Sequence, residues 1–406
     1  MKILCILGEH NYGDVKRGGG YEYTNFLPAL VNLGHDVLHF ESFSRGKYKD
    51  FADLNRRLLI CVENYQPDVV FCVLLGYEVW METLSLIREG SNATLINWST
   101  DDSWKYEQFS KFIAPAFDLY VTTYSDAMLK SVRDGHSNFY KSQWAADSGQ
   151  LQVPLPSSQC EFQVSFIGSC YGNRPKWVAD LSKLGISVNC FGHGWPGGTV
   201  PSTDIPRIIH NSVVSLNFGD SAFQWKGLIP RRSRQVKARV FEVTGAGGFL
   251  MTEDADGLDN FFILNEEVVV YKNVPDLVES IAFYLKHPAF RDRIALAGYR
   301  KTAMHHTYES RFSPMLAMAM RVKRPDRKLD PAIDMQRFEE LASRHQPGFL
   351  LRVLRKVMLW PCVLVWGKSR GPRAARRILF ELSWRFAGEK TYRSSGWPGR
   401  LFYRES

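Results

Sequence analysis

The chain has 406 residues, of which 45% are hydrophobic and 23% are charged. This length suffices for about two domains, and the composition is that of a folded protein, which excludes a chain disordered throughout. The formal net charge of +9 resides in the segment 345–406, which carries 13 Lys and Arg against three Glu, so the rest of the chain is close to neutral.

The cysteines and the apolar runs bear on the cellular compartment. Seven cysteines are scattered without a Cys-x-x-Cys spacing, and several lie in apolar runs such as 70–73. We therefore expect reduced, buried thiols and a cytoplasmic protein. The apolar run 2–7 is too short for a signal peptide, and no stretch reaches the roughly 20 apolar residues of a membrane span.

Strand-like apolar runs alternate with helical patterns from the start of the chain. We expect strands at 2–7, 36–40, 68–75, 93–98 and 118–123, and helices near 22–33, 48–64, 79–89, 107–116 and 126–133. Continuous apolar runs indicate strands that are buried on both faces, and strand–helix repetition predicts a parallel α/β sheet. Residues 1–150 are therefore expected to form one α/β domain.

The same pattern restarts after a Pro- and Ser-rich break at 152–158, which is a candidate hinge. We expect strands at 163–167, 187–191, 213–218, 249–252 and 268–271, and helices near 174–183, 203–210, 234–245, 274–286, 289–301 and 310–322. The segment 323–334 is charged and contains proline, as linkers do. The sequence thus predicts a second α/β domain over 151–322, and a linker with a basic tail over 323–406.

Two loops of the first domain carry candidate functional groups, because ligands of parallel sheets bind beyond the carboxyl ends of the strands. A run of three glycines that includes Gly19 and Gly20 precedes Glu22 at a helix start, and would let a ligand approach the backbone. A merely flexible loop would have the same residues. The fourth strand ends at Asp101 and Asp102, which lie between tryptophans and are candidates for a general base. Alternatively, Asp102 or Ser103 caps the next helix.

The second domain opens with a strand, a glycine turn and a helix start, at Gly168, Ser169 and Arg174. The start of a helix with basic residues nearby suits a diphosphate group. A capped helix with solvated basic side chains would show the same pattern.

The most informative stretch is 234–252, which is predicted to be a helix, a glycine stop and a buried strand. Arg239 and Glu242 are three residues apart and therefore share one helical face. A cation can meet phosphate there, while a carboxylate accepts hydrogen bonds from ribose hydroxyls. A surface ion pair fits the spacing equally well. The acidic pair Asp254 and Asp256 resembles a metal motif, but short acidic loops are common and no metal site is expected.

These segments resemble one known family. The resemblance rests on 166–169, 191–192, 235–249, 265–268, Tyr271, 305–308 and Arg311. They are similar to the group 1 glycosyltransferases of the spore-maturation CgeB type, over about residues 1–320. The resemblance implies the GT-B fold, with two facing Rossmann-like domains. Residues 1–150 would be the acceptor domain and 151–322 the donor domain, followed by a basic helical C-terminal extension.

The resemblance also implies an activity and roles for residues. A sugar would pass from a nucleotide diphosphate sugar to a glycan, lipid-linked or protein acceptor in cell-surface glycoconjugate assembly, without an obligatory metal or other cofactor. Glu242 would contact the donor ribose, Arg239 a donor phosphate, and Gly168 with Ser169 the diphosphate. We further expect Arg174, Gly19 and Gly20 to contribute to donor binding, and Glu22, Asp101 and Asp102 to catalysis.

One departure from the family pattern bears on the mechanism. Many group 1 enzymes carry two glutamates eight positions apart on this segment, but the residue eight before Glu242 is Arg234. The missing acid bears on how the enzyme holds the donor sugar, and on whether transfer retains the stereochemistry of that sugar. It also favours an alternative function, a non-catalytic scaffold that binds a nucleotide sugar or a glycan.

The basic tail predicts an interaction surface. Segments 349–360 and 376–385 mix apolar and basic residues at helical spacing, a pattern that favours an anionic membrane surface. We expect peripheral docking at the inner face of the membrane. The alternative is a helical extension that packs on the rest of the protein. Nucleic acid is a weaker candidate, because the body is neutral and carries no RNA-binding motif.

Overall fold

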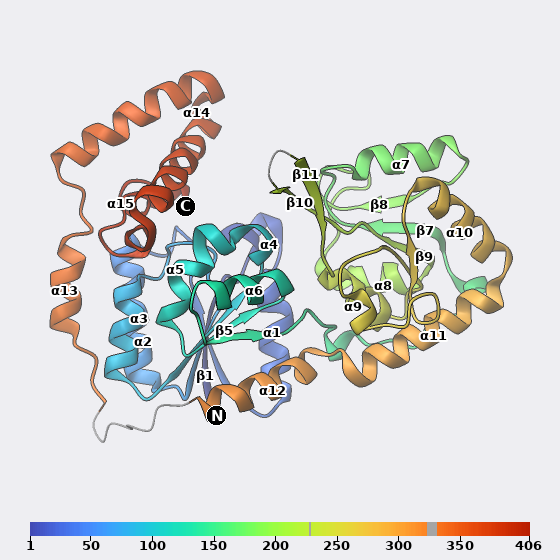
Figure 1. Cartoon of the computed structure of the whole chain (residues 1–406), viewed down its shortest axis with the longest axis horizontal. Helices are drawn as coiled ribbons and strands as arrows, with labels where there is room; N and C mark the ends of the chain where they lie inside the picture. Colours follow the sequence, from blue (N-terminus) through green and yellow to red (C-terminus); the bar gives the residue numbers. More distant parts are fainter. Residues whose placement is uncertain (227–228, 323–330) are drawn as a thin grey trace. The chain divides into compact units, whose positions relative to one another are not determined.

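A computed structural model describes residues 1–226, 229–322 and 331–406, with no side-chain description over 220–233. Two compact units result, one formed by 1–142 with 314–406 and the other by 143–313. Helix α12 (Tyr308–Arg321) begins in the second unit and ends in the first. Most of the expected linker, 323–330, lies outside the described residues. Figure 1 shows the elements along the chain.

The first unit is built on a parallel sheet of six strands in the order β2-β1-β3-β4-β5-β6. The strands are β1 (Lys2–Leu7), β2 (Asp36–Glu41), β3 (Val69–Cys72), β4 (Thr94–Ser99), β5 (Leu119–Thr122) and β6 (Phe139–Lys141). The first five match the predicted strands closely. Strand β6 was missed because it is a short, half-buried edge strand without an apolar run.

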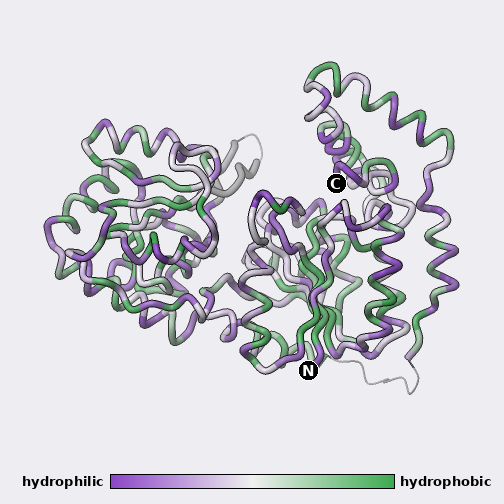
Figure 2. The backbone as a smooth tube through the Cα atoms, turned by 180° about the vertical axis from the view of Figure 1, so that it is seen from behind, coloured by the Kyte–Doolittle hydropathy of each residue, from purple (hydrophilic) through white to green (hydrophobic). Residues whose placement is uncertain are grey.

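Helices cover both faces of this sheet (Figure 1). They are α1 (Tyr21–Asn32), α2 (Phe51–Tyr65), α3 (Met81–Gly90), α4 (Asp102–Lys105), α5 (Lys111–Ile113) and α6 (Ser125–Arg133). Phe26 of α1 packs against Phe71 and Trp98, while the other face, with Leu4 and Val70, packs against α2 and α3. The strands are apolar over most of their length (Figure 2), as burial on both faces requires.

The second unit has a parallel sheet of five strands in the order β13-β12-β9-β7-β8. These are β7 (Phe162–Ile167), β8 (Asn189–Phe191), β9 (Ser212–Asn217), β12 (Leu250–Glu253) and β13 (Val269–Tyr271). Numbered within each unit, both sheets run 2-1-3-4-5, and the first adds β6. The direction in which the chain adds strands to the sheet reverses between β1 and β3 in the first unit, and between β7 and β9 in the second. Parallel sheets of this kind bind their ligands at these points.

The helices of the second unit follow the prediction with one correction. They are α7 (Arg174–Lys183), α8 (Ile205–His210), α9 (Ala238–Gly245), α10 (Val274–Lys286) and α11 (Pro288–His305). The expected helix over 234–245 begins only at Ala238. Arg234 belongs to a hairpin of β10 (Asp220–Lys226) and β11 (Ile229–Arg234), whose antiparallel pairing holds it extended. Lys237 is also extended, with φ −88° and ψ 158°.

Short 3-10 turns join the longer elements. They cover Asn11–Gly13, Val15–Arg17, Ala114–Ala116, Ser148–Gln150, Ser157–Gln159, Ser202–Asp204, Leu258–Asn260, Gly388–Tyr392 and Tyr403–Glu405. They connect the longer elements, and some supply core residues, among them Ala114, Tyr392 and Leu258.

The Pro- and Ser-rich segment 152–158 is held within the second unit instead of acting as a free hinge. The Gln152 amide donates to the Gly245 carbonyl at 2.9 Å, and the Leu155 carbonyl accepts from buried Arg291 at 2.8 Å. The Ser157 amide donates to Asp292 at 3.0 Å. Backbone groups with such partners are fixed in place, and the units divide at residues 142 and 143 instead of at 150.

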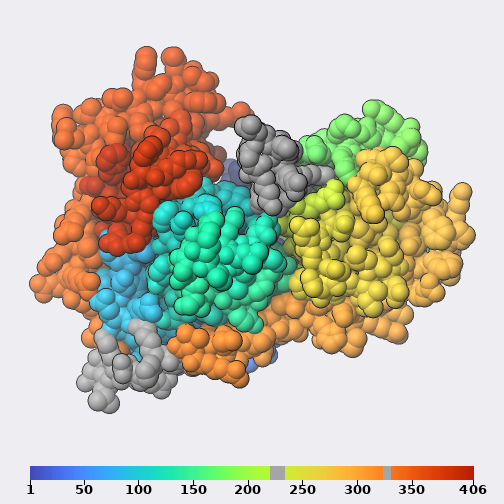
Figure 3. Space-filling model, in the orientation of Figure 1, coloured from blue at the N-terminus to red at the C-terminus, as the bar shows by residue number. Residues whose placement is uncertain are grey.

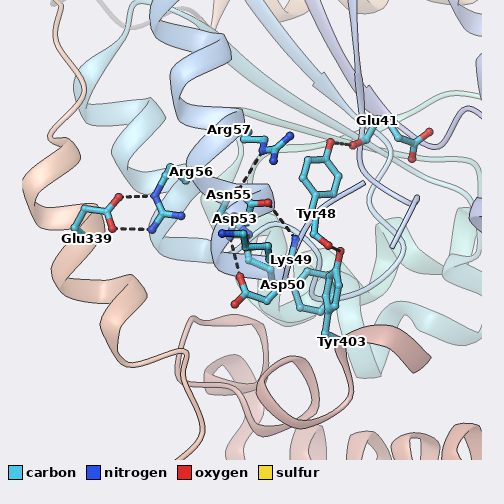
Figure 4. Close-up of polar contacts among 11 residues, drawn as sticks. Glu41, Tyr48, Lys49, Asp50, Asp53, Asn55, Arg56, Arg57, Glu339 and Tyr403 are labelled. Carbon is cyan, nitrogen blue, oxygen red and sulfur yellow. Dashed lines mark hydrogen bonds and ion pairs between the residues drawn. The ribbon is translucent and has the colours of Figure 1, made fainter. Parts of the chain in front are cut away.

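The C-terminal extension is part of the first unit. Its helices are α13 (Met335–Ser343), α14 (Phe349–Ala387) and α15 (Trp397–Leu401). Glu339 pairs with Arg56 at 2.6 Å, and the Tyr403 hydroxyl donates to the Tyr48 carbonyl at 3.1 Å (Figure 4). The end of the chain lies directly against residues 1–142 of the same unit (Figure 3). Among the described residues, no helix has the length and hydrophobicity to cross a bilayer.

Candidate functional site

In the first unit, the predicted acidic residues meet at the carboxyl ends of β1 and β4. Glu22 lies in the first turn of α1, and Asp101 follows β4 and forms an ion pair with Lys105, with 3.5 Å between Oδ2 and Nζ. Glu22 as a residue is partly exposed, but protein surrounds its carboxyl group. This burial raises the pKa of Glu22 to about 6, the charge of Asp101 adds to the rise, and Lys105 opposes it.

Asp102 has a different environment from its neighbour. It is 1% exposed, and its Oδ1 accepts hydrogen bonds from the hydroxyls of Ser99, at 2.7 Å, and Ser110. Ser110 ends a π-helical turn, Tyr106–Ser110, that joins α4 to α5. Burial raises the pKa of the Asp102 carboxyl. The expected cap is not found, since Asp102 lies in the first turn of α4 and its bonds go to hydroxyls. These hydrogen bonds suit a positioning role, which we propose for Asp102 in place of the predicted catalytic one.

The glycines before α1 serve the packing of their own loop. A Cβ atom on Gly20 would lie 2.5 Å from the carbonyl oxygen of Gly8, and one on Gly19 would lie 2.8 Å from Thr24 Cγ2. The Asn11 side-chain amide closes the loop by donating to the Gly19 carbonyl at 2.8 Å. These glycines thus permit a close approach between backbone segments of their own loop. The loop belongs to the first unit, whereas the other residues predicted to bind the donor belong to the second.

In the second unit, the turn between β7 and α7 is tightly built. The Gly168 amide donates to the Phe191 carbonyl at 2.8 Å. The guanidinium of Arg174 donates to the Ser169 carbonyl at 2.9 Å and lies 4.1 Å from the ring centroid of Tyr171. Arg174 is only 9% exposed. Its first role is therefore to hold the turn in shape, at the point where the order of the strands reverses.

Arg239 and Glu242 form the ion pair that their spacing predicted. Arg239 Nη1 lies 2.6 Å from Glu242 Oε2 on α9, and the two side chains are 21% and 18% exposed. A pair on an open surface would be largely solvated and worth little. This pair is mostly shielded from water, so a ligand that exchanged partners with it would meet little competition from solvent.

Glu253 is a further candidate for a functional residue, although in the sequence it looks like part of an acidic loop. It ends β12, is fully buried, and accepts the Gly219 amide at 2.8 Å. Arg234 Nε lies 4.0 Å from its other carboxylate oxygen. Arg234 therefore faces a buried carboxylate. The position of Glu253 at the end of an apolar strand was the available signal. Within 1–226, 229–322 and 331–406, no cluster of three His, Cys, Asp or Glu could hold a metal ion.

His306, from the 305–308 motif, is buried in an aromatic environment. Its Nε2 lies 2.9 Å from the Phe261 carbonyl, which can only accept, so Nε2 carries the proton. Its Nδ1 then accepts from Arg311 at 2.9 Å. Burial, together with the charge of Arg311, lowers the pKa of His306 to about 4.

We expect His306 to make the stability of the second unit depend on pH. The unfolded chain binds a proton near pH 6.5 but the folded one only near pH 4, so the stabilisation is complete above pH 6.5 and is lost as the pH falls towards 4. The shift corresponds to about 3 kcal/mol of unfolding free energy. Urea titrations between pH 7.5 and 4.5 should show this slope in the natural sequence and lose it in His306→Asn.

The exposed neighbour offers the control, since His305→Asn should keep the slope. Should His306→Asn fail to fold, an NMR titration of the natural protein gives the pKa directly. A His306 ring that titrates near 6.5 would contradict the structure.

Comparison with known proteins places these sites in a family context. Residues 174–317 match a family model described as glycosyl transferase-like. The spore protein CgeB of Bacillus subtilis (strain 168) is 22% identical over 284 residues, which cover 62% of this chain and 82% of CgeB.

Solved structures are similar over most of the chain. Sucrose-phosphate synthase from Thermosynechococcus elongatus has a TM-score of 0.57 at 10% identity, with 79% of this chain and 99% of that chain covered. Anabaena HepE, in complex with UDP and glucose, has a TM-score of 0.53 at 11% identity, with 78% and 100% covered. With two Rossmann-like parallel sheets in the chain, these similarities confirm the predicted GT-B fold.

Proposed function

We propose that this chain, a distant homologue of CgeB with the GT-B fold, transfers a sugar from a nucleotide diphosphate sugar to a glycan, lipid-linked or protein acceptor in cell-surface glycoconjugate assembly. The matching family model describes a glycosyltransferase, and the resemblance to the CgeB type implies the same activity. The observation that carries the proposal is the shielded Arg239–Glu242 pair on α9, at 2.6 Å, inside the matched region.

The donor groups belong to the second unit. Glu242 accepts hydrogen bonds from the ribose hydroxyls, and Arg239 contacts a phosphate and stabilises the negative charge of the leaving diphosphate. The turn at Gly168 and Ser169 supports the diphosphate, and Arg174 keeps this turn in shape through its bond to the Ser169 carbonyl. Because Arg239 supplies positive charge to the phosphates, the reaction is proposed to need no obligatory metal.

The group that accepts a proton belongs to the first unit. As the new glycosidic bond forms, the acceptor hydroxyl must lose its proton. With a pKa of about 6, the Glu22 carboxylate is ionised at neutral pH and yet more basic than an ordinary glutamate, which suits a general base. Asp101 and Lys105 adjust this basicity with opposite charges.

Nucleotide binding and donor turnover test the proposal. We expect one nucleoside diphosphate among UDP, GDP and ADP to raise the melting temperature in a concentration-dependent manner. UDP is the first to try, because HepE binds it. The matching sugar nucleotide should be hydrolysed slowly, equally well with and without EDTA. The proposal fails if no nucleoside diphosphate at millimolar concentration changes the melting temperature and no sugar nucleotide is consumed.

One observation favours a second function, a scaffold that binds a nucleotide sugar or glycan without turnover. Arg234 stands where many relatives have an acid, and it faces the buried carboxylate of Glu253 at 4.0 Å. Selective nucleotide binding without hydrolysis or transfer would support this alternative.

We also propose a cytoplasmic location for either function. All seven cysteines lie in the described part of the chain as free thiols, which suits a reducing compartment.

A further inference from the structure

The first half of α14, residues 349–366, has two apolar faces. One face packs on the rest of the extension through Leu351, Leu354, Met358, Leu359 and Cys362, against Leu379, Leu401 and Phe402. At Gly367, with φ +74°, the chain leaves helical geometry and then turns back. A Cβ atom on Gly371 would lie 2.6 Å from Val363 Cα, so the two halves approach closely there. The first half is therefore held firmly by its inner face.

The outer face carries a continuous exposed apolar stripe. Its members follow each other at intervals of three and four residues, and are Leu350, Val353, Val357, Trp360 and Leu364. This spacing places them on one side of a helix. Leu350 is 81% exposed, Trp360 70% and Leu364 73%. Soluble proteins rarely leave such a contiguous apolar surface uncovered.

The sequence around this stripe is basic. Between Leu341 and Phe380 the sequence has no Asp or Glu, and it has nine basic residues, Arg344, Arg352, Arg355, Lys356, Lys368, Arg370, Arg373, Arg376 and Arg377. Arg355 is engaged with the Leu401 carbonyl and Glu405. Arg352 and Lys356 are exposed beside the stripe, one helical turn apart. Polar and apolar residues alternate along α14 in Figure 2.

We propose that the outer face of 349–366 lies on the surface of an anionic lipid bilayer. The apolar stripe enters the boundary between headgroups and acyl chains, and the basic residues contact the lipid phosphates. At 1.5 Å per residue, the segment would lie along about 27 Å of membrane. A second copy of the chain is a poorer occupant, because it would bring two basic surfaces together. Nucleic acid would leave the apolar stripe unused.

Vesicle flotation of the full chain tests this proposal. We expect the protein to float with vesicles of 70% phosphatidylcholine and 30% phosphatidylglycerol, and not with pure phosphatidylcholine. The variant Trp360→Glu/Leu364→Glu should bind the anionic vesicles at least about tenfold more weakly. The matched control is Leu382→Glu/Phe386→Glu, which changes two exposed residues at the same spacing on the later half of α14 and should bind normally.

Charge is tested separately. Arg352→Gln/Lys356→Gln should weaken binding by about 30-fold, at about 1 kcal/mol for each basic residue, and 0.5 M NaCl should weaken the binding of the natural chain. These two measurements decide the matter if the glutamate variant does not fold. Melting temperature and nucleotide binding report folding, and they do not depend on the membrane.

Three outcomes would overturn the proposal. One is that the natural chain does not float with anionic vesicles, and another is that both glutamate variants lose binding equally. The third is a dimer in light scattering that the stripe variant converts to a monomer while vesicle binding is absent. Because donor hydrolysis is measured in solution, failure of the membrane proposal is distinguishable from failure of the proposed function.

Discussion

Replacing the general base is expected to have the largest effect on catalysis: Glu22→Gln should lower kcat by about 10²–10⁴-fold. The amide keeps the size and polarity of the side chain but cannot take a proton from the acceptor. The nucleoside diphosphate should raise the melting temperature of the variant as much as that of the natural protein, because the proposed donor groups belong to the second unit. Steady-state kinetics and thermal shifts on the same samples separate these two effects.

The pH profile distinguishes a base from a merely structural residue. With the pKa of Glu22 at about 6, kcat/KM should fall as the pH drops below 6, since the protonated carboxyl cannot act as a base. The variant Asp101→Asn removes a neighbouring negative charge and should move this limb to lower pH. Lys105→Gln removes a positive charge and should move it to higher pH.

The neighbouring carboxylate supplies the control for these substitutions. Asp102→Asn removes a buried acceptor of the Ser99 and Ser110 hydroxyls, so its effect should appear in the melting temperature more than in the pH profile. An acid limb that stays in place in both Asp101→Asn and Lys105→Gln would remove Glu22 from the mechanism.

The local pattern of apolar and polar residues predicts most of the helices and strands, and the exceptions have physical causes. Buried strands such as β3 and β9 are visible because burial on both faces leaves an uninterrupted apolar run. Strand β6 has no such run, since it is a half-buried edge. The start of α9 was placed too early because the pairing of β11 with β10, a contact between two segments, holds Arg234 extended. Helical spacing in the sequence carries no record of such pairing.

The candidate site shows a similar division. The Arg239–Glu242 contact follows from a spacing of three on one helix, and the structure places the two groups 2.6 Å apart. By contrast, Asp101 and Asp102 are adjacent and chemically identical, yet one pairs with Lys105 and the other is buried against two serine hydroxyls. What separates them is the direction of each side chain at the end of β4, together with the π-helical turn that presents Ser110. Neither is encoded in residue type.

Removing the second carboxylate of the proposed mechanism should act on the donor: Glu242→Ala is expected to weaken nucleoside diphosphate binding by about 10- to 100-fold. Hydrogen bonds to a charged group are worth roughly 1.5–3 kcal/mol, and Glu242→Ala removes the carboxylate that would accept them from the ribose. Isothermal titration calorimetry measures the affinity directly. The exposed Glu279 is the matched control, and Glu279→Ala should bind as the natural protein does.

A change in the ligand isolates the ribose contact from the loss of the ion pair. The natural protein should prefer a ribonucleoside diphosphate over its 2′-deoxy form, because the 2′-hydroxyl donates to Glu242. Glu242→Ala should bind both forms with equal affinity, whereas Arg239→Ala breaks the same ion pair but should keep the preference, because the carboxylate remains. If Glu242→Ala discriminates between the two nucleotides as strongly as the natural protein, the 2′-hydroxyl does not meet Glu242, and the ion pair serves α9 alone.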